Sequence, residues 1–511
     1  MSVGELSEGS PWVARLRGTS VPRSLSASLC RLAMLAGLAS TSLATAPVAP
    51  AARELESSRL SVAAIARVGN RGADLATAIA VGRNGGVLVG MHFDGALETA
   101  RGKGRDKQED MVGRGGGDIA LVAFDRDLSP RWSRQFGGSA HDEVRSVVGV
   151  GAGFAFGGFF AGGAGFGDAT APPALTSQGA SDAFIGFVDA QGKPLASQRV
   201  GGKQADHVRA LATLDDGGLL VGGHFQAAAR FAPGPQGVVI GAGGTDVFVQ
   251  RLDVDRQVRW ARTVGGAGDD ELAALAALPD GGAILLMRHD QPIRLRVTAK
   301  SASVAPGSGH DALLVWLDAN GDISRTVSIA STGPDELHHL ALLDDGTVVV
   351  AGEFQGEQRW AVGAAGGAPL RSLGSTDVVI LFLDASGRPL EQRQIGSVGP
   401  DTADALATDG RNAWLALGWQ GRLSLGTKHA IESSDTGALL LRIERGGPAD
   451  HWLAFEGEGV QKITALAAQP GRVWVTGVFA GGLTAPGSAK TIESAGKSDV
   501  FVARVDTSAQ D

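Results

Sequence analysis

Six aspartates recur at nearly equal intervals along this chain, and their spacing is the first feature that invites a chemical interpretation. They are separated by 64 to 68 residues and comprise Asp74, Asp142, Asp206, Asp270, Asp335 and Asp401. If a repeat brings them into a ring around one mouth of a channel, they could hold a cation such as calcium, which prefers several oxygen ligands. The alternative is structural, because an aspartate often accepts hydrogen bonds from amides of its own loop. A residue repeated in every copy favours the structural role.

A second set of positions differs between the copies and is a better source of binding residues, because the scaffold does not dictate them. Each stands directly before a recurring aromatic or similar residue, and together they are His92, Phe159, His224, Arg288, Glu353, Gly418 and Val478. With His141, His207, His338 and His339 they could line one polar face; the alternative is that they are unrelated exposed residues. No His-x-x-x-His pair with a partnering acid occurs, so the sequence does not support a zinc site.

No catalytic constellation is recognisable. The sequence contains no Gly-x-Ser-x-Gly elbow, phosphate-binding loop, His-Glu-x-x-His helix or dinucleotide fingerprint. Sialidase-type aspartate boxes and the tryptophan-docking repeats of quinoprotein propellers are also missing, and the chain contains no tyrosine. Carboxylates do stand side by side at 269–271 and 335–336, but adjacency in sequence does not make a catalytic pair. We therefore assign no catalytic or cofactor-binding residue.

The elements that must position these residues form a repeat. A strand-like run closed by an acid occurs seven times, and most copies also open on an acid, as in Asp182, Asp246, Asp311, Asp377 and Asp499, which we interpret as turn stabilisers. Short runs rich in β-branched and aromatic residues between turn formers predict buried strands. The runs are 118–125, 182–189, 246–253, 311–318, 377–384, 437–444 and 499–506.

Each unit reads as strand, tight turn, strand, variable loop, strand, hairpin and strand. The recurring acid opens the first strand, and the second strand ends at the aromatic position. A fourth strand follows each buried run, at 132–136, 198–200, 260–264, 327–329, 392–395 and 452–455, whereas the last unit ends without one. Residues 61–68 carry that missing pattern at the other end of the repeat, so they are expected to complete the last sheet.

This offset predicts a closed ring, in which pairing the first and last units removes two exposed sheet edges. An open solenoid would gain nothing from it and would need polar caps. We predict an all-β fold: a single seven-bladed β-propeller of four-stranded antiparallel blades, with its ring closed by an N-terminal strand. The propeller is assigned to 53–511, with repeats starting near 69, 137, 201, 265, 330, 396 and 458, and 1–52 to an export signal and short linker.

Composition and the N-terminus bear on location and partners. Four arginines from Arg15 to Arg31 precede the apolar run 32–39, and small residues follow at 44–46, the layout of an export signal. The run is too short to span a bilayer. Cys30, the sole cysteine, lies before it, so a lipid anchor and disulfides in the mature chain are disfavoured. The formal net charge of -8 argues against a nucleic-acid partner.

The order of phrases resembles a known family. In 201–211 and 217–225 the chain reads Gly-Gly-x-x-x-Asp-x-x-x-Ala-Leu and Gly-Gly-x-Leu-Val-Gly-x-x-Phe, and Trp-x-Arg recurs in the fourth strand at Trp132 and Trp260. With the acid-bounded third run, this pattern resembles the bacterial SBBP-type β-propeller repeat over roughly residues 60–511. The resemblance implies a secreted or envelope-associated protein, of a family mostly without an assigned activity.

The sequence thus favours an exported, non-enzymatic binding or scaffold module in the periplasm, the outer envelope or the medium. It would be a monomer without a transmembrane segment in the mature chain, and its variable positions would bind a protein or glycan ligand. No cofactor is expected apart from the possible calcium. Two alternatives stay open: an exported polysaccharide hydrolase or lyase that uses the acids at the channel mouth, and a calcium-stabilised structural propeller.

Overall fold

The computed structural model describes residues 60–70, 72–98, 111–167, 175–232, 237–297, 300–304, 311–332, 335–362, 365–425, 429–447, 451–486 and 491–507. All of them belong to the second of two units into which the chain divides, between Glu56 and Ser57. The predicted export signal and linker, 1–52, lie outside the described residues. Within the described part of the chain, no helix is long and apolar enough to cross a membrane.

Seven consecutive sequence units each form four antiparallel strands, which confirms the all-β, antiparallel prediction. The first strands are β2 (Asp74–Val81), β8 (Asp142–Val150), β14 (His207–Thr213), β18 (Asp270–Ala277), β24 (Asp335–Leu342), β30 (Thr402–Thr408) and β34 (Gln461–Gln469). The second strands are β3 (Val87–Phe93), β9 (Gly153–Phe160), β15 (Leu219–Arg230), β19 (Ala283–His289), β25 (Val348–Phe354), β31 (Ala413–Leu425) and β35 (Arg472–Phe479).

The third strands are the predicted buried runs. They are β6 (Asp118–Phe124), β12 (Asp182–Val188), β16 (Val238–Leu252), β22 (Asp311–Leu317), β28 (Asp377–Leu383), β32 (His429–Ile443) and β38 (Asp499–Asp506). The fourth strands are β7 (Pro130–Gly138), β13 (Pro194–Gly202), β17 (Val258–Val264), β23 (Ile323–Ala330), β29 (Pro389–Ile395), β33 (Trp452–Gly457) and, for the last unit, β1 (Ser61–Val68).

The core lies between successive sheets, which explains why the third strands are apolar along their whole length. Every residue of β6, β12, β22 and β28 is buried, because a neighbouring sheet covers each face. In one such layer Leu121 of β6 packs in the same cluster as Phe156 of the next unit. The recurring aromatic position at the end of the second strand is likewise almost completely buried, as Phe93, Phe160, Phe225, His289, Phe354, Trp419 and Phe479.

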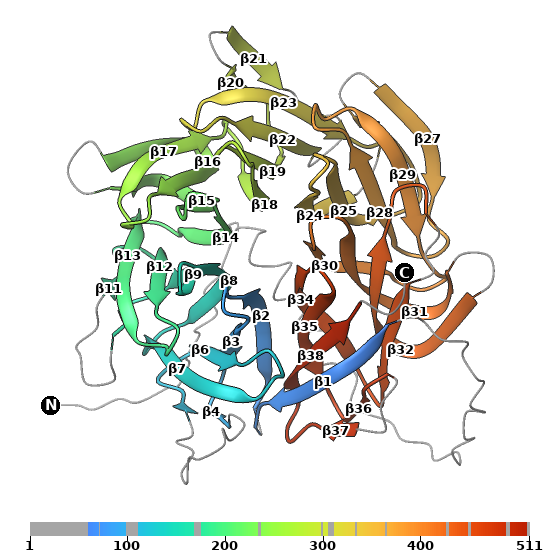
Figure 1. Ribbon diagram of the computed structural model, residues 1–511. Coiled ribbons are helices and arrows are strands. Elements are labelled where there is room, and N and C mark those ends of the chain that lie inside the picture. The colour runs from blue at the N-terminus through green and yellow to red at the C-terminus, as the bar shows by residue number, and fades with distance from the viewer. Residues whose placement is uncertain are drawn as a thin grey trace, which may run out of the picture. The chain divides into compact units, whose positions relative to one another are not determined.

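The first strands lie innermost and follow one another around a common centre (Figure 1). Each contacts the first strand of the next unit, from β2 through β8, β14, β18, β24 and β30 to β34, and β34 in turn contacts β2. Residues at the start of these strands therefore approach one another although they are more than sixty residues apart in the sequence.

Successive units meet through a repeated main-chain contact. The amide of the acid that opens a first strand donates to a carbonyl just before the third strand of the preceding unit, as in Asp142 to Gly117 (3.1 Å) and Asp206 to Ser181 (3.0 Å). The same contact joins the two ends of the repeat, where the Asp74 amide donates to Ser498 at 3.3 Å. The junction between the last unit and the first thus resembles those within the chain.

The N-terminal strand completes the last sheet, as the sequence predicted. β1 pairs antiparallel with β38 from Ser61 opposite Asp506 to Val68 opposite Val500. The guanidinium of Arg67 also forms an ion pair with Asp499 at 2.5 Å. This pairing gives the last sheet its fourth strand (Figure 1).

The sequence did not predict the hairpins within the variable loops. These are β4 (Ala96–Leu97) with β5 (Met111–Val112), β10 (Gly163–Gly165) with β11 (Leu175–Thr176), β20 (Ile293–Val297) with β21 (Lys300–Val304), β26 (Glu357–Val362) with β27 (Ala365–Arg371), and β36 (Gly482–Thr484) with β37 (Thr491–Glu493). In the third and sixth units the hairpin is continuous with the long strands β15–β16 and β31–β32. Hairpin strands pair with the fourth strand of the preceding unit in four places, which merges neighbouring sheets into longer ones.

Removing β1 should expose an edge of the last sheet. Deletion of residues 60–68 together with the preceding segment removes the buried side chains of Leu60, Ile65 and Val68 and the backbone bonds to β38. A buried aliphatic side chain contributes about 2 kcal/mol, so we expect the free energy of unfolding to fall by about 6 kcal/mol. The open edge should also promote oligomers.

The matched control is deletion of residues 1–59, which leaves β1 in place. Thermal melting and light scattering at several protein concentrations compare the two variants. If the chain without β1 stays monomeric and melts with the control, β1 has no structural role in the last sheet.

Candidate functional site

The unit-opening aspartates are buried rather than displayed. The five whose side chains are described are at most 1% exposed; the side chain of Asp335 lies outside the described part. One carboxylate oxygen of each accepts a hydrogen bond from the amide four residues earlier, for example 2.7 Å from Gly138 to Asp142 and 2.7 Å from Gly202 to Asp206. The same bond occurs at the remaining three, Asp74, Asp270 and Asp401. This geometry is the structural role that the sequence favoured.

Each of these acids also faces the acid that opens the preceding third strand, across a glycine. A methyl group on Gly137 would come within 2.7 Å of Asp118 Oδ1 and 2.8 Å of Asp142 Oδ2. Gly137 has a φ of 120°, a conformation that side chains other than hydrogen rarely allow. Gly201 lies in the same way between Asp182 and Asp206. Glycine is therefore required where two carboxyl groups approach the same stretch of backbone.

Burial raises the pKa of these carboxyl groups well above the usual range of aspartate. Burial, with a smaller contribution from the nearby Asp118, raises the pKa of Asp142 to about 6 although the hydrogen bonds from backbone amides oppose this shift. For Asp206, burial and the neighbouring Asp182 bring the pKa to about 7. Burial likewise raises to about 7 the pKa values of Asp74, Asp270 and Asp401. The pairs are thus easiest to accommodate with a proton on one member.

This placement bears on the chemical roles considered for the acids. A substrate cannot reach a carboxylate that is buried and bonded to its own loop unless the loop moves. Within the described residues, no three histidine, cysteine, aspartate or glutamate side chains are grouped closely enough to hold a metal ion. Calcium stabilisation stays a prediction, and an unchanged melting temperature on chelation would contradict it.

The variable positions lie at a different place, on the walls around the centre. Each is the cross-strand partner of the residue that follows the opening acid, as in Leu75 opposite His92 and Glu143 opposite Phe159. The same register pairs His207 with His224, Glu271 with Arg288, Glu336 with Glu353, Thr402 with Gly418 and Lys462 with Val478. All seven pairs are therefore at one level of the sheets.

A β-bulge two residues further on places another side chain beside each pair. The register of every first strand shifts at the third residue after the opening position. Bulges redirect a side chain and often occur near functional sites. The bulge residues are Thr77, Arg145, Arg209, Ala273, His338, Asp404 and Thr464. We call the cross-strand pairs and the bulge residues together the polar belt.

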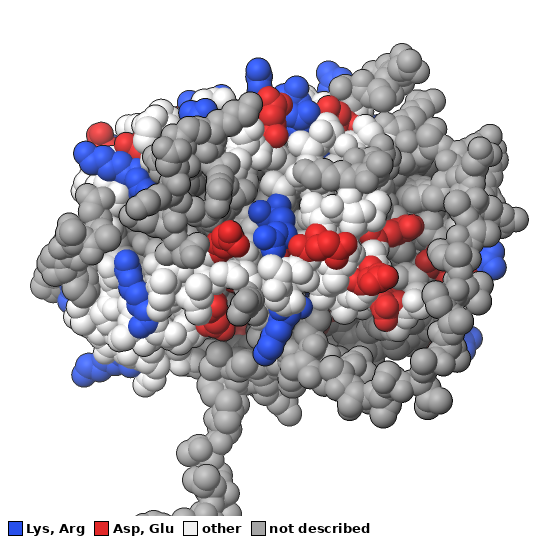
Figure 2. Space-filling model, turned by 90° about the horizontal axis from the view of Figure 1, so that it is seen from below, with Lys and Arg blue, Asp and Glu red and all other residues white. Residues whose placement is uncertain are grey.

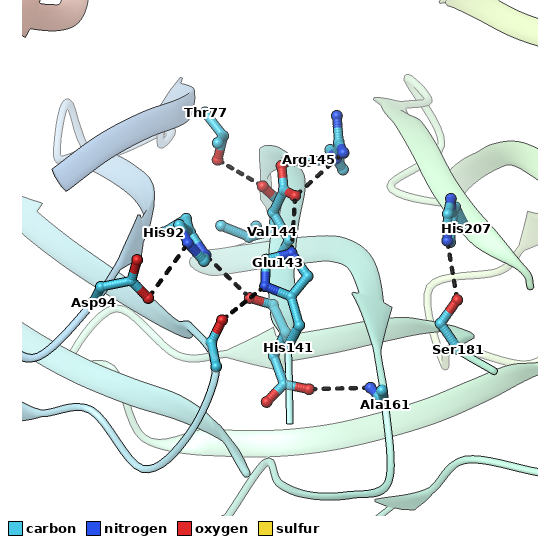
Figure 3. Close-up of polar contacts among 12 residues, drawn as sticks. Thr77, His92, Asp94, His141, Glu143, Val144, Arg145, Ala161, Ser181 and His207 are labelled. Carbon is cyan, nitrogen blue, oxygen red and sulfur yellow. Dashed lines mark hydrogen bonds and ion pairs between the residues drawn. The ribbon is translucent and has the colours of Figure 1, made fainter. Parts of the chain in front are cut away.

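In the first two units the belt is a chain of ring and ion-pair contacts (Figure 3). The rings of His92 and His141 lie 5.0 Å apart, and His141 Nε2 is 3.7 Å from Glu143, which pairs with Arg145 at 2.8 Å. The hydrogen bond with Glu143 raises the pKa of His141. Burial raises the pKa of Glu143, but His141 and Arg145 outweigh it, so this pKa is lowered.

The next segment is aromatic. Phe159 lies 5.4 Å from the ring of His141 and 4.4 Å from that of His207, and His207 lies 5.3 Å from that of His224. His207 is also bonded to Ser181 at 3.1 Å (Figure 3). Burial lowers the pKa values of His207 and His224 to about 3, and nearby charges reinforce the effect. Both rings are therefore neutral at ordinary pH.

The remaining charges of the belt are linked from unit to unit. Arg288 pairs with Glu271 at 2.9 Å and with Glu336 of the following unit at 3.5 Å. His338 lies 3.2 Å from Glu336 and 2.9 Å from Glu353. Burial would lower the pKa of His338, but these two carboxylates outweigh it and raise it.

The sixth and seventh units close this network. Glu353 accepts a hydrogen bond of 2.9 Å from the amide of Ala403. The almost fully buried side chain of Asp404 pairs with Lys462 at 2.9 Å and with the Thr402 hydroxyl at 3.0 Å. Burial raises the pKa of Asp404, although Lys462 opposes this shift. Belt contacts thus cross the boundaries between several neighbouring units.

A cavity of about 200 Å³ lies inside the belt and is lined by five first strands. Thr77, Arg145, His339, Asp404 and Thr464 are among its wall residues. A larger hollow of about 440 Å³ lies beside the outer strand β29 and adjoins residues outside the described part of the chain. The central cavity is the better-defined site, because charged groups of both signs converge on it.

All five proposed binding-face residues, His92, Phe159, His224, Arg288 and Glu353, lie in the belt. The additional histidines His141, His207, His338 and His339 join them there or line its cavity. Sequence reasoning missed Arg145, Arg209, Asp404 and Lys462. The common offset of Arg145, Arg209 and Asp404 from the opening position was visible in the sequence, but only the bulge explains why that offset faces the centre; Lys462 directly follows the opening position of the seventh unit.

Comparisons with known proteins add little to this geometry. No protein family and no curated protein matches the sequence. Among solved structures, the chain is similar to the WD40 β-propeller domain of Doa1 (TM-score 0.41, 9% identity, covering 88% of this chain and 97% of that one). It is also similar to a protein of unknown function from Dyadobacter fermentans (TM-score 0.37, 11% identity, 88% and 99%). These low scores carry no argument about function.

The buried carboxyl pairs should make stability depend on pH. A raised pKa means that the folded state binds protons more tightly than the unfolded chain, so stability is greatest in acid. We expect the free energy of unfolding to fall as pH rises from about 4 to about 7. Asp118→Asn removes one charge of the pair formed by Asp118 and Asp142 and places an amide donor toward Asp142. It should therefore stabilise the protein by about 1 kcal/mol at pH 8 and by less at pH 5.

Denaturant unfolding at pH 5 and pH 8 measures both effects. Asp215→Asn is the matched control, because Asp215 is exposed on a turn at the far end of β14. Equal stability of the Asp118 variant and the control at both pH values would contradict a shared proton in the pair.

Proposed function

We propose that this protein is an exported, non-enzymatic binding or scaffold module that holds its partner at the polar belt. The observation that carries the proposal is the convergence of the variable positions. Residues that differ from unit to unit, and are therefore not needed by the repeated scaffold, gather at one level around a central cavity. A rigid frame with one non-repeating, polar surface is the usual construction of a binding site.

We propose further that the frame is a single closed seven-bladed β-propeller. The cyclic order of contacts among the first strands supports this, because β34 lies beside β2 as β2 lies beside β8. The junction from Ser498 to Asp74 has the same main-chain bond as the internal junctions. The pairing of β1 with β38 adds the strand that the last sheet would otherwise lack.

Export is part of the proposal and is supported by the sequence alone. The arginines before the apolar run 32–39 and the small residues at 44–46 have the order of a cleaved signal. A periplasmic, outer-envelope or extracellular location is consistent with a chain that has only one cysteine, placed before that run. Expression with the native N-terminus, followed by mass determination of the exported product, tests cleavage near Ala46 or Ala52.

A protein or glycan is the partner class that best fits the belt, and we propose that the protein binds it as a monomer. The belt combines imidazole and phenyl rings with paired charges, which suits hydroxyl and carboxyl groups of a polar ligand. On the face seen in Figure 2, Lys and Arg are interspersed with Asp and Glu. Nucleic acid is a poor partner for such a surface, since phosphate backbones require clustered positive charge.

The hydrolase or lyase alternative has weaker support. A carboxyl group with a pKa near 7 suits acid–base catalysis, and five opening acids have pKa values of about 6 to 7. Each of the five, however, is buried and accepts an amide hydrogen bond from its own loop. The shifts have a local structural cause that recurs in unit after unit.

Substitution in the belt should weaken partner binding. Envelope, secreted and glycan fractions are passed over the immobilised protein. The affinity of the protein for the retained component is then measured. Replacing both His92 and His141 by alanine removes adjoining rings from the mouth of the belt, which should weaken binding tenfold or more.

The control replaces Arg83 and Asp215 by alanine, because both are exposed on turns at the opposite ends of first strands. Unchanged binding by the belt variant together with lost binding by the turn variant would place the partner elsewhere. Release of soluble sugars from a polysaccharide fraction, abolished by Asp206→Asn without loss of folding, would support the enzyme instead.

A further inference from the structure

One charge of the polar belt has no counterpart. Among the described residues, the guanidinium of Arg209 takes part in no hydrogen bond or ion pair. Its neighbours in the belt do: Arg145 is held by Glu143 at 2.8 Å and Arg288 by Glu271 at 2.9 Å. A guanidinium has five N–H donors in a fork that matches an oxyanion, and those of the partly buried Arg209 are free to receive one.

The position of Arg209 places this charge at the centre of the molecule. It is the bulge residue of β14, between Val208 and Ala210 in the register with β15. The corresponding residue of the preceding unit is Arg145, and β14 contacts both β8 and β18. At the same offset β18 carries Ala273, which is small and uncharged, and the carboxylate of Glu271 on that strand is already paired with Arg288.

The electrostatic influence of the neighbours supports this placement. Burial is the main cause that lowers the pKa of Arg209 to about 10; the charges of Arg145 and Arg288 add to this shift, whereas those of Glu271 and Glu143 oppose it. Burial also lowers the pKa of His339 to about 4, and Arg209 contributes although His339 belongs to β24, two units further on. Arg209 therefore acts on groups along the central wall, including one that lines the cavity.

A second polar atom beside Arg209 is also without a partner. The Nδ1 atom of His224 is buried and has no hydrogen-bond partner. Arg209 is the charged neighbour with the largest effect on this imidazole. The neutral ring can carry its proton on Nδ1 and donate it, so a donor from β15 joins the donors from β14.

We propose that Arg209 and His224 form a binding site for an oxyanion, a carboxylate, sulfate or phosphate group carried by the ligand of the belt. Arg145 and Arg288 add positive potential, although their own carboxylate partners compensate most of their charge. This inference rests on the proposed binding function, because it names the chemical group that the belt would select. It extends that function by predicting that the ligand is acidic, for example an acidic sugar.

The test titrates the full chain with three anions in a low-salt buffer and measures heat or melting temperature. Sodium glucuronate represents a carboxylate sugar, sodium sulfate a sulfate ester and sodium phosphate a phosphate ester, with glucose as the neutral control. We expect saturable binding of at least one anion and none of glucose. The preferred anion then distinguishes an acidic or sulfated glycan from a phosphorylated ligand.

Substitution of Arg209 identifies the site. Arg209→Met should weaken binding of the preferred anion about tenfold or more, whereas Arg209→Lys, which keeps the charge without the fork, should lose less. The control, Arg388→Ala, removes an exposed arginine from a turn near an outer strand and should change nothing. Without anion, Arg209→Met should melt no lower than the parent, since an uncompensated charge is removed.

The outcomes separate this inference from the proposed function. Absence of saturable binding by all three anions, or equal affinity of the parent and Arg209→Met, would overturn the oxyanion site even if belt substitutions abolish partner capture. Anion binding that depends on Arg209, in a protein whose partner capture ignores the belt histidines, would sustain the site and refute the proposed binding face.

Discussion

The boundary between successive sheets rests on a buried aspartate that begins the first strand of a unit. Its carboxylate holds the amide four residues earlier, and its own amide bonds to the preceding sheet, so a single residue joins the two units. The arrangement brings a second carboxyl group close, separated only by a glycine, as at Gly137. Burying two acids together is unfavourable unless they share a proton. The repeat retains this pair because it fixes the position of each sheet relative to the next.

A fixed junction explains why function can concentrate at the centre. The carboxylate bond is seen at the start of five first strands, and the bulge occurs in all seven, so the residues one and three positions after the opening residue occupy equivalent places in every unit. The backbone thus repeats while these side chains do not. In one unit the two places hold Glu143 and Arg145, and in another Thr402 and Asp404. Seven equivalent places around one centre act as a single surface whose composition can change without disturbing the frame.

The sequence specified most of the frame and only part of this surface. Strand order, the buried third strands and the role of residues 61–68 follow from alternation and turn residues, which are local signals. The sequence did not predict the hairpins of the variable loops, because short segments such as Gly163–Gly165 form strands only by pairing with a neighbouring unit. Arg209 could not be singled out for a different reason. It is of interest because it lacks an ion-pair partner among the described residues, and ion pairing depends on neighbours in the folded structure. His224 and Glu353 could be named as candidates because variation against a repeated background is visible in one sequence.

The distribution of charge in the belt explains how a polar surface can be selective. Removing an ion from water is unfavourable unless a partner replaces the lost hydration, and nearly every charge here has such a partner. Glu143 has Arg145, Asp404 has Lys462, and His338 has two glutamates. Paired charges hold their positions but attract a further ion only weakly. A ligand would therefore gain most where compensation is incomplete, as at Arg209, whose guanidinium has no ion-pair partner among the residues that the structure describes.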